Sequence, residues 1–161
     1  STRFPSRRTS DLLETIIDKC LFRVASDRLY SREGVWCLFE ERDGSQRVRI
    51  GLADYLQQVN GDVAFAHVKP AGTVLSAGDE VAEIETIKAN VSVLSPITGT
   101  VVELNPALET SPETINQEPF GNGWLAVIEA RDWPSESAKL LAPEAYLTLM
   151  RAQAEEELGK Q

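Results

Sequence analysis

The chain has 161 residues, of which 42% are hydrophobic and 25% are charged, a composition typical of one globular domain and not of a disordered or fibrous chain. Residues 1–60 contain 10 basic and 9 acidic side chains, whereas residues 61–161 contain 6 and 16, within a formal net charge of −9. This acidic balance argues against nucleic acid as a partner, and the lack of an apolar run of about 20 residues argues against a membrane span. Two cysteines and one histidine exclude a disulfide scaffold and a His-rich metal site, and they fit a reduced, cytoplasmic compartment.

Residues 1–29 are predicted to form an N-terminal extension that contains an amphipathic helix from about Asp11 to Ser26. Apolar side chains recur in this segment at helical spacing, namely Leu12, Leu13, Ile16, Ile17, Cys20, Leu21 and Val24. Ser10 or Asp11 fits the start of such a helix, because a short polar side chain there can cap the free backbone amides. We expect the apolar stripe to pack on the following domain, with Cys20 as an inert residue within it.

Residues 30–130 are predicted to form short strands separated by turns. The expected strands are Val35–Phe39, Arg47–Ile50, Asp62–His67, Val81–Glu85, Val91–Leu94, Val101–Leu104 and Trp124–Ile128. Asp43-Gly44 lies between the first two and is a strong hairpin signal, and a brief helix is expected at Ala53–Val59. This pattern predicts a mainly β protein, folded as a flattened barrel or sandwich.

Residues 131–161 are predicted to form a C-terminal helical extension. Pro143 fits a first helical position, the run Glu144–Leu158 forms the body, and Gly159 fits the end. The expected packing face consists of Tyr146, Leu149, Met150, Ala154 and Leu158. The three consecutive glutamates at 155–157 are interpreted as a solvated face and not as a metal site.

Lys88 occupies the connection between two strand-like runs, Val81–Glu85 and Val91–Leu94. A lysine at the tip of a hairpin can be reached from most directions, and no neighbour that would activate its amine is visible in the sequence. On the hairpin alone, the ordinary interpretation is a solvated charge. Exposure without activation also fits a residue that another enzyme modifies.

The motifs around this hairpin resemble those of the glycine cleavage H-protein family. The matching segments occur in the family's order and span about Tyr30 to Ile128: Gly51–Tyr55, Gly61–Val63, Ser95–Gly99, Val102–Asn105, Ala107-Leu108, Ser111–Glu113, Ile115-Asn116 and Pro119–Leu125. The resemblance implies the lipoyl-domain fold, with lipoate in amide linkage on Lys88. It also implies that Glu85 and Gly99, three residues before and eleven after the lysine, help the lipoate-attaching enzyme to recognise the hairpin. A biotin carrier shares the architecture, but its lysine usually lies between methionines, unlike Ile87-Lys88-Ala89.

A carrier of this kind need not be an enzyme, because the attached group supplies the sulfur chemistry while the protein presents it. The family's partners are glycine decarboxylase, aminomethyltransferase and dihydrolipoyl dehydrogenase, and we expect a monomer that carries no metal. The tethered arm, about 10–15 Å long at standard bond dimensions, would move between their active sites.

Two positions depart from the family pattern. Gly34 and Val35 stand where H proteins often have a His-Glu pair, and Ser92 stands where an acidic residue often follows the lysine by four places. In the family these carboxylates help to hold the aminomethylated arm in a cleft. His67 also stands where an acidic residue is common, and a surface histidine is the preferred interpretation over a cargo contact.

These departures leave three hypotheses open. The first is an H-protein-like lipoate-binding protein, of the kind found in sulfur-oxidising bacteria, that serves a heterodisulfide-reductase-like complex. The second is an authentic H protein that carries the aminomethyl group. The third is a binding module that keeps the fold without lipoate. The loss of both carboxylates and the added terminal segments favour the first hypothesis, with Cys37 interpreted as a buried strand residue and not as a second thiol near the arm.

Overall fold

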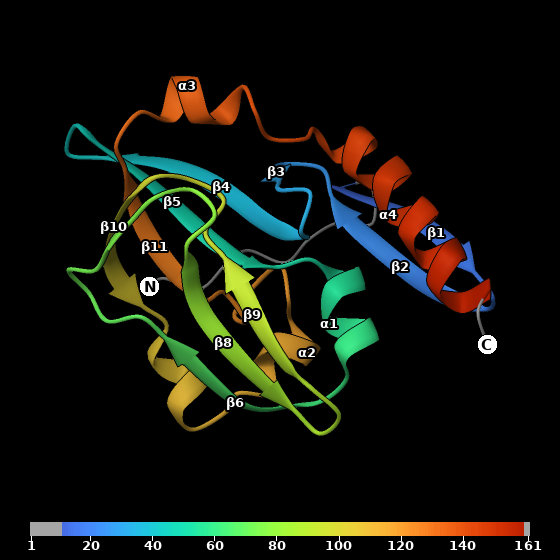
Figure 1. Cartoon of the computed structure of the whole chain (residues 1–161). Coiled ribbons are helices and arrows are strands. Elements are labelled where there is room, and N and C mark those ends of the chain that lie inside the picture. The colour runs from blue at the N-terminus through green and yellow to red at the C-terminus, as the bar shows by residue number, and fades with distance from the viewer. Residues whose placement is uncertain (1–10, 160–161) are drawn as a thin grey trace.

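The computed structural model describes residues 11–159 and shows a β sandwich with a hairpin and a long helix packed at one side (Figure 1). The larger sheet has six strands in the order β3-β4-β5-β11-β10-β7, and the smaller has three in the order β6-β8-β9. The strands are β1 (Leu12–Ile17), β2 (Cys20–Ala25), β3 (Leu29–Tyr30), β4 (Val35–Arg42), β5 (Ser45–Leu52), β6 (Val63–Val68), β7 (Val74–Leu75), β8 (Glu80–Thr86), β9 (Asn90–Leu94), β10 (Gly99–Leu104) and β11 (Ala126–Ala130). The predicted mainly β, lipoyl-domain-like sandwich is therefore confirmed.

Apolar side chains from both sheets form the main core between them. Val48 and Ile128 contribute from the larger sheet, and Ile84 and Val93 from the smaller sheet. All four are at most 2% exposed, as the inward positions of alternating strands require. This core fixes the orientation of the β8–β9 hairpin, so the turn that carries Lys88 projects from a rigid layer.

The helices connect or cover the sheets. They are α1 (Asp54–Asn60), the 3₁₀ helix η2 (Pro106–Glu109), α2 (Thr114–Gln117), α3 (Trp133–Ser137) and α4 (Pro143–Gly159). The brief helix predicted near Ala53–Val59 and the long C-terminal helix are both confirmed. Tyr146, Met150 and Ala154 on the predicted packing face of α4 are buried, Leu149 is half-buried, and the side chain of Leu158 lies outside the described residues. Among residues 11–159, no helix is long and apolar enough to cross a bilayer.

The predicted N-terminal helix is wrong, because the segment forms the antiparallel hairpin β1–β2. Asp18 and Lys19 both have positive φ, 49° and 69°, and form the two-residue turn that a hairpin needs and a helix cannot contain. Burial then alternates along each strand, so that Thr15, Ile17, Phe22 and Val24 face inward. Residues 1–10 of the predicted extension lie outside the described residues.

The hairpin packs on α4 and α1 and closes a second apolar cluster. Val24, Met150 and Ala154 are fully buried together in this cluster, beside Trp36 of the larger sheet. Arg151 of α4 donates a hydrogen bond of 2.6 Å to Thr15 of β1. Cys20, which was expected to be an inert core residue of the apolar stripe, is exposed at the start of β2, so the expected burial is also wrong. Cys37 is 1% exposed in β4, as predicted.

Candidate functional site

Lys88 lies in the three-residue connection at the tip of the β8–β9 hairpin, between Thr86 and Asn90. The backbone amide of Thr86 donates to the carbonyl of Ala89 at 2.8 Å, and the Thr86 hydroxyl oxygen accepts from the Ala89 amide at 3.1 Å. The amide of Ile87 also donates to the carbonyl of Asp62 at 3.3 Å, which ties the tip to the residue before β6. These bonds hold the backbone of the turn in place.

The Lys88 side chain is exposed and makes no ion pair with any of residues 11–159. Its neighbour Ile87 is 83% exposed, so the tip presents both an apolar and a cationic side chain to solvent. A buried or permanently paired lysine could not accept a modifying group, whereas this amine can be reached. The geometry fits an attached acyl arm.

Asn116 supports the base of this tip. Its side-chain amide donates to the carbonyl of Gly61 at 3.0 Å and to the side chain of Gln57 at 3.0 Å, and its oxygen accepts from the amide of Val63 at 2.9 Å. One side chain therefore joins the end of α1 to the start of β6, next to the lysine. The sequence pattern contained Asn116 as part of a motif, but it did not show this role.

The outer face of the smaller sheet is acidic. Glu85 is paired in register with Phe65, and Glu83 with His67 on one side and Ser92 on the other. His67 Nε2 lies 3.6 Å from the Glu85 carboxylate, and both side chains are partly exposed. The predicted residues Glu85, His67 and Ser92 therefore share one solvent-facing surface beside Lys88.

Ser92 is tied to a further carboxylate on this face. Its hydroxyl donates a hydrogen bond of 2.6 Å to Glu80, one strand away. The position that is acidic in many H proteins is thus uncharged here, yet a carboxylate lies next to it. Glu83 and Glu85 share the outer face of β8 at the two-residue period of a strand, and an irregularity in the pairing between Glu80 and Ala82 lets Glu80 reach Ser92 as well.

Gly34 and Val35 lie in a different environment from His67 and Ser92. Val35 is 1% exposed in the main core, and Gly34 is buried with a φ of 92°. A Cβ on Gly34 would lie 3.2 Å from the Tyr146 hydroxyl, so helix α4 packs closely over this position. The structure therefore places two of the four predicted cargo residues on the surface and two inside.

Gly99 has a packing role that the sequence did not reveal. It is buried at the start of β10, where a Cβ would lie 2.2 Å from the carbonyl oxygen of Glu129 in β11 and 2.8 Å from a side-chain atom of Ile128. Only glycine permits this close approach of the two strands. Recognition of Gly99 by an attaching enzyme stays a prediction, and any such effect would act through the shape of the fold.

A cleft lies beside the lysine between α1 and β2. It has a volume of about 470 Å³, and its lining includes Lys88, Cys20, Phe22, Val59 and Glu157. The sequence interpretation missed this cleft, because it placed Cys20 and Phe22 on a helix. Its walls come from both ends of the chain and from α1, so no local pattern in the sequence reveals it.

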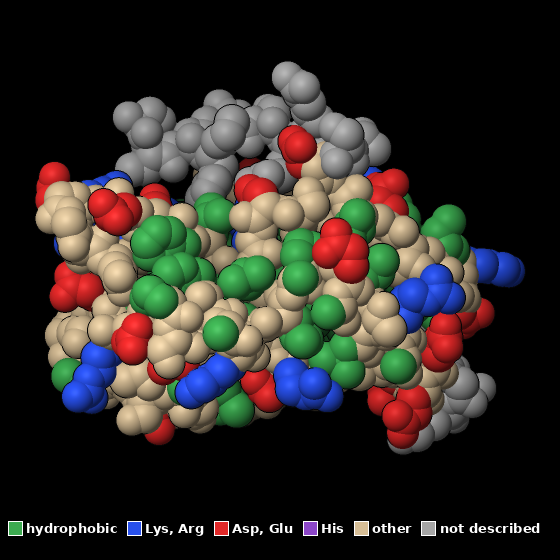
Figure 2. Space-filling view, turned by 90° about the horizontal axis from the view of Figure 1, so that it is seen from above, with side chains coloured by type: hydrophobic (Ala, Val, Ile, Leu, Met, Phe, Trp, Pro, Cys, Tyr) green, Lys and Arg blue, Asp and Glu red, His purple; other side chains and the backbone are tan. Residues whose placement is uncertain are grey.

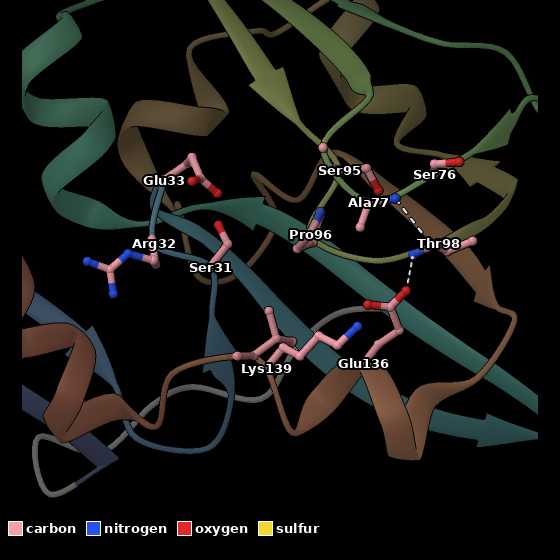
Figure 3. Close-up of a pocket in the computed structure, with 12 residues that line it drawn as sticks. Ser31, Arg32, Glu33, Ser76, Ala77, Ser95, Pro96, Thr98, Glu136 and Lys139 are labelled. Carbon is pink, nitrogen blue, oxygen red and sulfur yellow. Dashed lines mark hydrogen bonds between the residues drawn. The ribbon is translucent and has the colours of Figure 1, made fainter.

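A second cavity, of about 400 Å³, lies at the other end of the β8–β9 hairpin (Figure 3). Ser95, Thr98 and Glu136 line it, and Glu136 accepts a hydrogen bond from the backbone amide of Thr98 at 3.1 Å. Acidic and basic side chains are interspersed with apolar ones on the nearby face opposite the Lys88 tip (Figure 2). Within residues 11–159, no three His, Cys, Asp or Glu side chains are grouped as metal ligands.

Comparison with known proteins identifies one family throughout. The family described as glycine cleavage H-protein matches residues 28–153, which include α3 and most of α4. The glycine cleavage system H protein of Cronobacter sakazakii is 39% identical over 127 residues, covering 79% of this chain and 95% of that protein. The H protein of Xanthomonas campestris is 36% identical over 131 residues, covering 81% and 97%.

A solved structure agrees with these relatives. The crystal structure of a glycine cleavage system H protein from Mycobacterium marinum is similar with a TM-score of 0.65 and 26% identity, covering 76% of this chain and 95% of that one. Members of this family are non-catalytic carriers with lipoate attached covalently to a lysine. The sequence matches and the shared sandwich lead to the same assignment: the chain belongs to the glycine cleavage H-protein family.

Proposed function

We propose that this protein carries lipoate on Lys88 and transfers the aminomethyl group of the glycine cleavage reaction between partner enzymes. The observation that carries the proposal is the exposed side chain of Lys88, which has no ion pair within residues 11–159, at a hydrogen-bonded hairpin tip in a chain of this family. The partners are glycine decarboxylase, aminomethyltransferase and dihydrolipoyl dehydrogenase. The enzyme that attaches lipoate is a fourth, transient partner.

The chain's own residues present the arm. Hydrogen bonds between Thr86 and Ala89, and from Ile87 to Asp62, hold the backbone of the tip, so the arm can move by side-chain torsions without a change in the turn. Amide formation removes the positive charge of Lys88 and leaves an apolar stem beside Ile87. When bound, the lipoyl group supplies the sulfur atoms that accept and release cargo.

Carboxylates near the tip fit a cationic cargo. Glu83 and Glu85 lie on the outer face of β8, within the span of an arm of about 10–15 Å. A protonated amine beside partly exposed carboxylates gains a modest electrostatic attraction. This acidic face compensates in part for the missing charges at Val35 and Ser92.

The sulfur-oxidation role expected from Val35 and Ser92 has no support in the relatives, which are named as glycine cleavage proteins. The specific observation in its favour is that Val35, which stands where H proteins often have a glutamate, is apolar and 1% exposed, so it offers no charge to an aminomethyl group. A heterodisulfide-reductase-like partner therefore remains the second candidate, and a loading experiment separates the two.

Intact-mass measurement after co-expression with a lipoate-attaching enzyme tests the carrier assignment. We expect one lipoyl group on the wild-type chain and none on Lys88→Ala. Lys69→Ala, which removes another exposed lysine, should be lipoylated like the wild type. A wild-type chain that stays unmodified, or a lipoylated Lys88→Ala, would contradict the assignment.

Incubation of the lipoylated chain with glycine decarboxylase, glycine and pyridoxal phosphate tests the cargo. We expect a mass increase by one aminomethyl group on the reduced arm, stable enough to be transferred by aminomethyltransferase. Lipoylated chain that is never loaded, while a known H protein is loaded in parallel, would reject the glycine cleavage role and favour the sulfur alternative.

A further inference from the structure

The cleft between α1 and the β1–β2 hairpin has walls that come from outside the family match. Cys20 and Phe22 precede residue 28, where the match begins, and Glu157 follows residue 153, where it ends. The common core contributes Tyr55 and Val59 of α1. The terminal segments of this chain, outside the family match, therefore supply part of the wall of this cleft.

Lys88 lines the same cleft, and its side chain lies over the end of α1. A Cβ placed on Gly61 would lie 3.5 Å from the Cε atom of Lys88. The stem of the lysine thus lies close to the end of α1, and the lysine shares the lining of the cleft with residues of the hairpin.

The cleft walls suit an acyl arm. Phe22 and Tyr55 are nearly buried and meet edge to face with ring centroids 5.5 Å apart, and Val59 packs on the same cluster. A lipoyl chain is mostly methylene groups that gain by leaving water, and the volume of about 470 Å³ lies in the range of small-molecule pockets. The amide-linked arm carries no charge, so it can lie on apolar side chains without desolvating an ion.

We propose that this cleft is a docking site for the arm on Lys88, in which the arm's sulfur atoms come within reach of the Cys20 thiol. The proposal rests on lipoylation of Lys88. Cys20 is exposed and lines the cleft, whereas Cys37 is buried in the main core, where burial raises the pKa of its thiol.

Docking of the oxidised arm permits an exchange that needs no other reagent. The Cys20 thiol loses its proton and attacks one sulfur of the dithiolane, whose S–S bond breaks as the new S–S bond to Cys20 forms. The displaced arm sulfur leaves as a thiolate and takes up a proton. The reverse attack restores both groups, and the intact mass does not change.

The test compares alkylation of Cys20 in lipoylated and unmodified protein under native conditions, with each site located by peptide mass. We expect slower labelling in the lipoylated form by about threefold, the factor for an arm that covers Cys20 roughly two-thirds of the time. A non-reducing peptide map after rapid acid quenching should also contain Cys20 linked to the Lys88 peptide. Cys37 should remain unlabelled in both forms.

The matched control moves the thiol to the other strand of the hairpin. In Ile16→Cys combined with Cys20→Ser, the new thiol replaces a side chain that is 68% exposed and does not line the cleft. We expect equal labelling with and without lipoate and no cross-link.

Intact mass separates the two ways in which the experiment can fail. Absence of lipoate on Lys88 would refute the carrier assignment and this proposal with it. Complete lipoylation with equal labelling rates of Cys20 and no linked peptide would overturn the docking site alone.

Discussion

Tyr30 and Tyr146 stack face to face between β3 and α4, with ring centroids 4.5 Å apart and an interplanar angle of 6°. The Tyr30 hydroxyl donates to the carbonyl of Ala25 at 2.7 Å. The Tyr146 hydroxyl is buried beside Gly34 and has no hydrogen-bond partner among the described residues. Burial raises the pKa of both phenols, so each stays protonated in the folded protein. Two rings with similar packing thus differ in the free energy of their hydroxyl groups.

Substitution by phenylalanine should therefore act in opposite directions at these two positions. Tyr146→Phe removes a buried, unpaired hydroxyl and should raise the free energy of unfolding by about 1 kcal/mol. Tyr30→Phe leaves the carbonyl of Ala25 unpaired and should lower it by about 1 kcal/mol. Urea unfolding followed by tryptophan fluorescence measures both. A clear loss of stability in Tyr146→Phe would show that its hydroxyl has a partner, such as bound water.

At the scale of the elements, the two hairpins β1–β2 and β4–β5 have the same kind of turn with different residues. Lys19 has a φ of 69° in the first, and Gly44 has a φ of 78° at the same place in the second. Positive φ is strained for a residue with a Cβ and unstrained for glycine. A side chain at position 44 would meet nothing within 4 Å, so the backbone conformation alone decides its effect.

Substituting each turn residue by the other should change the free energy of unfolding in opposite directions. Lys19→Gly should raise the free energy of unfolding by about 1 kcal/mol, and Gly44→Lys should lower it by a similar amount. Midpoints of urea unfolding report each change, and the double variant should be close to wild type, because the turns are far apart in the fold. An unchanged free energy of unfolding in Lys19→Gly would mean that the first turn is not formed as described.

These turns also show what the sequence could predict. Asp43-Gly44 was identified as a hairpin because glycine marks a turn with positive φ, and α4 was placed because Pro143 and Gly159 fit its ends. Asp18-Lys19 carries no such mark, and the apolar residues around it fit a helical stripe as well as two alternating strands. The local pattern alone could not distinguish a helix from a hairpin. The hairpin that forms packs on α4 and α1, which are distant in the sequence.

The candidate site, like the fold, was predictable from the sequence only in part. The position of Lys88 in a hairpin, the strands around it and its exposure were predictable from local pattern and family motifs. The cleft beside it was not, because Cys20 and Glu157 are 137 positions apart and meet only through the packing of the two ends of the chain. The role of Gly99 was also hidden, since the close approach of Glu129 depends on strand pairing.

For the whole molecule, attachment of lipoate changes the formal net charge from −9 to −10. The lipoylated chain should therefore elute from an anion-exchange column at higher salt than the unmodified chain. Unmodified Lys88→Ala has the same charge as the lipoylated wild type and should elute close to it, which separates the effect of charge from that of the arm. Equal elution of the lipoylated and unmodified wild type would show that the charge of Lys88 is already neutralised.

The hydrogen bonds at Thr86, Ala89 and Asp62, which hold the tip, affect how the proposed arm on Lys88 would move from one enzyme to the next. In the proposed carrier, with the backbone of the tip held by these bonds, the arm on Lys88 moves by rotation about single bonds, and the turn does not have to unfold and refold at each partner enzyme. The attachment point then keeps a fixed position relative to the sandwich, and the arm reaches each partner's active site from that position. The rate at which the arm reorients is set by side-chain torsions on the nanosecond timescale and not by refolding of the turn.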